Sequence, residues 1–83
     1  MKKMKEFEEF TRQEKQRIHN HLESTYGEGA YMIESWRSRK DSLDYILCDV
    51  DVRRESDDKL IVVYVNVDMT DRRKSFIHRS ELM

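Results

Sequence analysis

The N-terminal part of the chain has hydrophobic residues at helical spacing. Phe7 and Phe10 lie three residues apart. Ile18, Leu22 and Tyr26 then follow at every fourth position, which places them on one face of a helix. The pattern predicts an N-terminal helix whose apolar side packs against the rest of the domain.

Local signals indicate where this helix begins and ends. The segment Thr11-Arg-Gln-Glu14 fits a capping box, so a helix can begin at Arg12 after a short helical arm over residues 1–10. One bent helix over about residues 4–25 fits the pattern equally well. Gly27 is the expected C-terminal stop, because glycine adopts a positive φ without steric cost.

After Gly29 the hydrophobic period changes from helical to two. Residues 43–52 and 60–69 alternate in this way and are rich in β-branched and aromatic side chains, which favours strands. Residues 54–58 between them are polar and predict a turn. The two segments therefore predict an antiparallel hairpin.

The register of this hairpin follows from its hydrophobic pattern. One register pairs apolar residues at every position of one face, and we call these pairs the apolar ladder: Val52–Ile61, Val50–Val63, Cys48–Val65 and Ile46–Val67. A slip by one residue would send the paired side chains to opposite faces. The sequence thus specifies this register strongly.

Residues 30–38 predict a third strand, joined to the hairpin by a short polar turn. A turn of two or four residues places Tyr31 and Ile33 on the face of the apolar ladder. It turns Trp36 to the opposite face, across from Tyr45. A loop of three or five residues would instead place Trp36 on the face of the apolar ladder and turn Tyr31 to the opposite face. The sequence therefore leaves this register open.

The C-terminal segment fits two structures. Asp71 or the preceding threonine could cap a short helix in which Phe76 and Ile77 lie on one side. A fourth strand over 74–79 is the alternative, and it would point these two side chains to opposite faces. We favour the helix. The predicted fold class is α+β, in the order α-β-β-β-α, with the N-terminal helix packed on one face of a three-stranded antiparallel meander.

Composition narrows the class of protein. The chain has 83 residues, 40% charged and 37% hydrophobic, with a formal net charge of −1. No stretch approaches the roughly 20 apolar residues of a membrane span, and no segment fits a signal peptide. The balanced charge excludes a global attraction to nucleic acid or to an anionic membrane. We expect one small cytoplasmic domain over residues 1–83, without membrane contact.

Histidine and cysteine offer no metal site. Cys48 is the only cysteine, which excludes an intramolecular disulfide and a thiolate metal site. His19 and His21 are two residues apart, so on a helix they point in different directions and cannot share a metal ion. We expect no bound metal and no cofactor.

Three carboxylates are the best catalytic candidate. Asp49 and Asp51 share one face of a strand, with Glu34 expected nearby, and such a group could hold Mg²⁺ for phosphodiester cleavage. No lysine or histidine on that face supplies a general base. We therefore predict a protein without enzymatic activity, with a metal-dependent nuclease as the residual alternative.

The face opposite the apolar ladder combines aromatic, methionine and acidic side chains. Such a mixture is typical of a protein interface. The predicted interface residues are Met32, Glu34, Trp36, Tyr45, Leu47, Asp49, Asp51, Val62 and Tyr64. We expect a small non-catalytic binding protein, a regulator or inhibitor of a protein partner, of the kind that phages and mobile elements encode. In two alternatives, the C-terminal helix covers this face or a homodimer buries it.

A basic cluster supports a rival function. Two groups of cations flank the acidic part of the chain, and a meander places them at one end of the sheet: Arg37, Arg39 and Lys40, then Arg72, Arg73 and Lys74. Clustered cations near a helix N-terminus are typical of a duplex nucleic-acid-binding module. The predicted element order is similar to that of double-stranded-RNA-binding domains. The segment Arg72-Arg-Lys-Ser-Phe76 does not match that family's Lys-Lys-x-Ala-Lys run.

Overall fold

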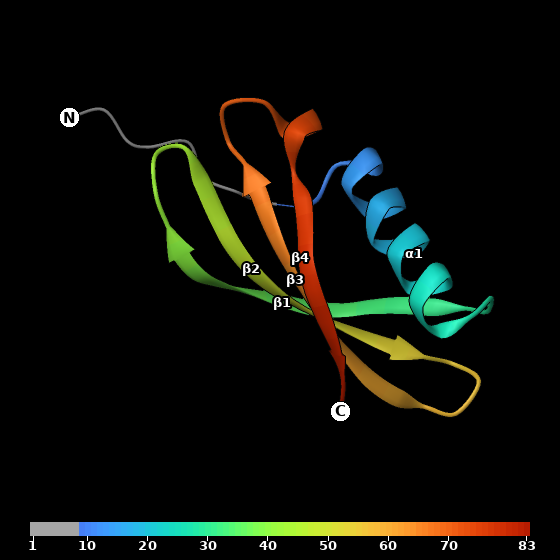
Figure 1. The fold of residues 1–83 in the computed structure, drawn as a ribbon. Coiled ribbons are helices and arrows are strands. Elements are labelled where there is room, and N and C mark those ends of the chain that lie inside the picture. The colour runs from blue at the N-terminus through green and yellow to red at the C-terminus, as the bar shows by residue number, and fades with distance from the viewer. Residues whose placement is uncertain (1–8) are drawn as a thin grey trace.

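The computed structural model describes residues 9–83, so Phe7 and most of the expected helical arm lie outside the described part. The strands form one antiparallel sheet in the order β1-β2-β3-β4, and α1 packs on one face of it (Figure 1). The α+β class is therefore confirmed. The elements are α1 Arg12–Tyr26, β1 Tyr31–Asp41, β2 Tyr45–Arg54, β3 Lys59–Asp68, the 3₁₀ helix η1 Arg72–Lys74 and β4 Phe76–Leu82.

The predicted capping box defines the start of α1. The Thr11 hydroxyl accepts a hydrogen bond from the Glu14 amide (3.1 Å), and the Glu14 carboxylate accepts one from the Thr11 amide (2.8 Å). The helix ends where predicted, at Gly27, which has a φ of 99°. Because the helix begins at Arg12, the alternative of one bent helix from about residue 4 is wrong.

The β2–β3 hairpin has the predicted register. Val50 pairs with Val63 and Cys48 pairs with Val65, as the apolar ladder requires. These side chains are buried. They form the core together with Ile18 and other apolar residues of α1 and of the segment just before it. The main driving force for the fold is thus the burial of one sheet face under one helix.

The register of β1 differs from the prediction. Irregularities between Ile33 and Ser35 and between Ser38 and Lys40 each insert an extra residue, which shifts the alternation of side chains. Trp36 consequently lies opposite Val50, on the face of the apolar ladder, and its ring packs edge-to-face on Phe10 at 5.9 Å. The expected pairing of Trp36 with Tyr45 is wrong. The bulges are favoured because they let the indole join the core.

The C-terminal segment is strand β4, and the prediction of a closing helix is wrong. In β4, Ile77 pairs with Val65 and Ser80 pairs with Val63. A strand here satisfies the backbone groups along the outer edge of β3, which a helix would leave unpaired. The capping residue Asp71 starts only the short η1, where its carboxylate accepts a hydrogen bond from the Arg73 amide. The element order therefore no longer matches that of double-stranded-RNA-binding domains.

A buried ion pair fixes the start of α1 to the β3–β4 connection. Glu14 is 1% exposed, and Arg72 donates to both of its carboxylate oxygens (2.7 and 2.5 Å). The Ser75 hydroxyl donates a further hydrogen bond to the same carboxylate (2.6 Å). Burial alone raises the pKa of Glu14, but the hydrogen bonds from Arg72, Ser75 and Thr11 outweigh it and hold this pKa below its ordinary value.

The other end of α1 is attached to β4. The hydroxyl oxygen of Ser80 lies 2.8 Å from the Nε2 atom of His21 and 2.7 Å from the hydroxyl oxygen of Tyr26. Partial burial lowers the pKa of His21. Through both attachments α1 packs mainly over the β3–β4 side of the sheet.

Candidate protein-binding face

One face of the sheet is left uncovered by the helix. Within residues 9–83, α1 packs on the face of the apolar ladder and no other helix packs on the opposite side, which we call the open face. The strand pairing places most of the predicted interface residues there. They are Met32, Glu34, Tyr45, Leu47, Asp49, Asp51, Val62 and Tyr64.

Trp36 does not belong to the open face. Its indole is half-buried against the core on the helix side of the sheet. The strongest aromatic anchor that the sequence suggested is therefore structural, and an interface on the open face has to rely on other aromatic side chains.

Tyr64 lies at the centre of the open face, within reach of two arginines. The guanidinium carbons of Arg39 and Arg79 are 4.9 and 4.4 Å from the centroid of its ring. The Tyr64 hydroxyl donates to Glu81 (2.9 Å), and Arg79 donates to the same carboxylate (2.6 Å). These contacts hold the pKa of Glu81 below its ordinary value, Arg79 having the larger effect. Cation–π contacts of this kind orient the ring and both guanidinium groups.

Three carboxylates of the open face are paired with arginines across strands. Arg39 donates to Asp49 (2.9 Å), Arg37 lies 3.1 Å from Asp51, and Arg53 lies 3.1 Å from Glu34. The hydrogen bond with Asp49 raises the pKa of Arg39. Each of the three carboxylates that could have held Mg²⁺ thus has an arginine partner, and Arg37 also lies 3.8 Å from Asp49. In the described part of the chain, no group of acidic, histidine or cysteine side chains is arranged to hold a metal ion.

Strand β4 adds side chains that sequence reasoning did not place on this face. Phe76 is 50% exposed, and its ring lies 4.8 Å from that of His78. A hollow of about 350 Å³ opens beside Tyr64, between side chains of β1 and β4 that include Arg39, His78 and Arg79. The sequence could have indicated this placement only if the segment had been read as a strand, because the adjacent residues Phe76 and Ile77 then point to opposite faces of the sheet.

The six cations of the rival hypothesis do not form one exposed cluster. The β1–β2 turn and the β3–β4 connection do lie at the same end of the sheet, where the Met69 amide donates to the Asp44 carbonyl (2.8 Å). The cations divide between the two faces, and five of the six lie against other protein groups, whereas Lys74 is exposed in η1. Arg37 and Arg39 bind carboxylates of the open face, Lys40 lies 6.0 Å from the Tyr45 ring, Arg72 binds Glu14 on the helix side and Arg73 binds Asp71.

Comparisons with known proteins found no match to a family model, to a curated protein or to a solved structure. Separately, no helix within residues 9–83 is long and apolar enough to cross a membrane. The function therefore has to be argued from the geometry of the open face and of the surfaces around it.

Proposed function

We propose that this chain is a small non-catalytic binding protein that contacts a protein partner through the open face of its sheet. The observation that carries this proposal is the position of Tyr64, flanked by Arg39 and Arg79 beside a hollow of about 350 Å³. Tyrosine and arginine are enriched among the residues that dominate interface energetics.

The contacts on the open face favour binding because they order its side chains in advance. Arg39 is held by both Asp49 and Tyr64, and Arg79 by both Glu81 and Tyr64. Long side chains that are already ordered lose less conformational entropy on association. The guanidinium groups retain donors for a partner's carbonyl or carboxylate oxygens.

Acidic and basic side chains alternate on this face. The arrangement of these charges, and not the net charge of the protein, would therefore determine which partner binds. A partner would need a hydrophobic or aromatic group for the hollow beside Tyr64 and acceptors for Arg39 and Arg79. We place the role among small regulators and inhibitors of the kind that phages and mobile elements encode. A cytoplasmic location is part of the proposal, because the single cysteine is a buried free thiol.

The test compares a double variant with a matched control. Tyr64→Ala with Phe76→Ala removes two aromatic side chains from the open face, whereas Leu43→Ala removes a hydrophobic side chain that is 76% exposed in the β1–β2 turn. Affinity capture from host cells, read by quantitative mass spectrometry, should recover a partner with the wild type and with Leu43→Ala and lose it with the double variant. Equal recovery by all three folded proteins would reject the open face as the binding site.

Two further measurements separate this proposal from the alternatives. A duplex nucleic-acid module would retard DNA or RNA strongly in a gel shift at about 50 mM salt, and the retardation would weaken when Arg37, Arg39 and Lys40 are neutralised. A homodimer through the open face would show a concentration-dependent mass in sedimentation, and the double variant would abolish it. Either result would contradict the proposal that the open face binds a different protein.

A further inference from the structure

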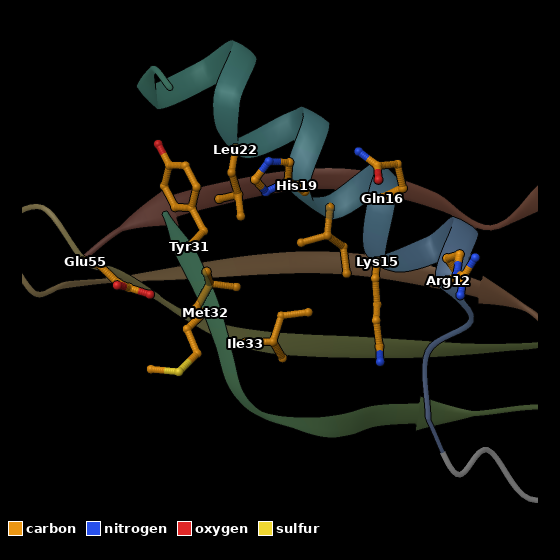
Figure 2. Close-up of a pocket in the computed structure, with 11 residues that line it drawn as sticks. Arg12, Lys15, Gln16, His19, Leu22, Tyr31, Met32, Ile33 and Glu55 are labelled. Atoms are coloured by element: carbon orange, nitrogen blue, oxygen red, sulfur yellow. The ribbon is translucent and has the colours of Figure 1, made fainter. Parts of the chain in front are cut away.

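A groove runs between α1 and β1, on the side of the sheet that the helix covers only in part. Because α1 contacts β4 and η1 at one side of the sheet, the strip of the apolar face nearest β1 is left open. The volume of the groove is about 550 Å³. Figure 2 shows the side chains that line it. Its apolar floor is formed by Ile18, Leu22, Ile33 and Val52.

Two aromatic pairs connect the helical segment with β1, and one of them, the His19–Tyr31 pair, lines this groove. The rings of His19 and Tyr31 are 6.2 Å apart, and those of Phe10 and Trp36 are 5.9 Å apart. Since β1 runs antiparallel to α1, the first pair lies near the C-terminal half of the helix and the second near its start. The groove therefore lies beside the His19–Tyr31 pair, between α1 and the first residues of β1.

The rim of the groove carries positive charge at the start of α1. Arg12 and Lys15 line it and are exposed, and within residues 9–83 neither forms a salt bridge. Figure 2 shows the Lys15 side chain extending from α1 toward the strands. The helix N-terminus adds to the positive potential at this end. At the opposite end the groove is lined by Glu55, so a bound ligand would be oriented by charge.

The groove also reaches the free edge of the sheet. Within the described residues, β1 pairs only with β2, so its other edge has no partner strand. Met32 points toward the open face by alternation, yet it lines the groove together with Tyr31 and Ile33. A ligand in the groove would therefore contact the backbone edge of β1 as well as the apolar floor.

The backbone groups of this edge are directed outward at two positions. The Glu55 amide donates to the Ala30 carbonyl (3.0 Å), which makes Ala30 a hydrogen-bonded partner of β2. Hydrogen-bonded and non-hydrogen-bonded positions alternate along an antiparallel strand. The N–H and C=O groups of Tyr31 and Ile33 consequently point away from β2, toward the free edge. The bulge after Ile33 limits this regular segment to a few residues.

We propose that the groove binds a short extended peptide of a partner protein, which adds as a further strand beside β1. The peptide's backbone would pair with Tyr31 and Ile33, and an aliphatic side chain would pack on the floor. An acidic side chain would lie near Arg12 and Lys15. Strand addition uses main-chain hydrogen bonds for affinity and side-chain pockets for specificity, and this site offers both. The site does not depend on the open face.

The test selects peptides from a random display library on the folded, full-length protein. Selected peptides should share an aliphatic residue and an acidic residue at a fixed spacing. Charge reversal by Arg12→Glu with Lys15→Glu should weaken their binding at least about tenfold, since two complementary charges become repulsive. The matched control is Lys40→Glu with Lys74→Glu, which changes the net charge equally on exposed lysines that do not line the groove. It should leave the affinity unchanged.

Amide hydrogen exchange identifies the mode of binding. Addition of a strand should slow the exchange of the Tyr31 and Ile33 amides, whereas the Met32 amide, already directed toward β2, should change little. The Tyr64→Ala, Phe76→Ala variant should bind the peptides like the wild type, so this result is independent of the open face. Three outcomes would overturn the proposal: no enriched peptides, equal binding by the charge-reversed variant, or binding of the small anion decanoate in the groove without protection of Tyr31 and Ile33.

Discussion

The buried Glu14 carboxylate allows a quantitative test of what holds α1 on the sheet. In an Arg72→Met variant, Glu14 keeps its hydrogen bonds from Ser75 and Thr11 but loses both charge-assisted bonds, of 2.7 and 2.5 Å. Breaking a buried ion pair by removing one partner costs about 3–5 kcal/mol, because the remaining charge is uncompensated. This is a large part of the roughly 5–15 kcal/mol by which a domain is stable. The melting temperature should fall by at least about 12 °C.

The pH dependence of this loss has a definite sign. In the wild type the folded-state pKa of Glu14 is below the ordinary 4.5, so its stabilising contribution is present above that value and is lost as the pH falls through the lowered pKa. In Arg72→Met the hydrogen bonds and the charge of Arg72 no longer lower the pKa of Glu14, so its folded-state pKa should be higher than in the wild type. The destabilisation of the variant should therefore be largest near neutral pH and should shrink on acidification through this pKa.

Urea denaturation followed by Trp36 fluorescence and circular dichroism, repeated across this pH range, measures the effect. Arg73→Met is the matched control, since the Arg73 side chain is 78% exposed and its pair with Asp71 lies at the surface. Its unfolding midpoint should equal that of the wild type. A deficit for Arg72→Met that is below about 1 kcal/mol, or that grows as the pH falls, would refute the role assigned to the pair.

Two further predictions concern the core. Trp36→Ala should lower the free energy of unfolding by about 2 kcal/mol in a urea titration read by circular dichroism, because a half-buried ring is removed from its packing on Phe10; an unchanged free energy would place the indole outside the core. The Cys48 thiol should stay unreactive toward a disulfide reagent at about pH 8 until the protein unfolds, because burial, followed by the charges of Asp41, Glu14 and Asp49, raises its pKa to about 12. Immediate labelling of the folded protein would contradict this assignment.

The parts of the fold that sequence alone predicted are those in which a pattern repeats. In β2 and β3 the alternation continues over the whole length of both strands, so a single register satisfies all apolar pairs at once. The start and end of α1 were predicted from Thr11, Glu14 and Gly27, since capping is a local interaction. Neither prediction needed knowledge of distant contacts.

The errors occurred where a distant contact determines the local structure. Glu34 and Arg39 carry no local signal for a bulge, and the benefit of the bulges lies in the packing of Trp36 on Phe10. The segment after Met69 has a plausible cap at Asp71, but the unpaired edge of β3 favours a strand. The buried pair of Glu14 and Arg72, 58 residues apart, could not be inferred from a capping box alone.

The residues of the candidate site were likewise predicted where a repeated pattern places them, and missed where a distant contact does. The residues of β2 and β3 on the open face, such as Asp49 and Tyr64, follow from alternation. Arg79 and Glu81 were missed because they belong to β4, which was expected to be helical. Arg39 was named only in the alternative nucleic-acid-binding hypothesis, because its pairing with Asp49 depends on the bulged path of β1.

The two bulges of β1 connect both proposed binding surfaces. The bulge after Ile33 turns Trp36 inward, so the indole stabilises the helix side, and it ends the regular segment of β1 whose Tyr31 and Ile33 line the groove. The bulge after Ser38 brings Arg39 over Asp49 and Tyr64, which orders the centre of the open face. An edge strand interrupted in this way resists pairing along its whole length, and this protects it from unspecific association. It leaves one short regular segment, next to an apolar groove with a basic rim, where a partner strand could be recognised selectively.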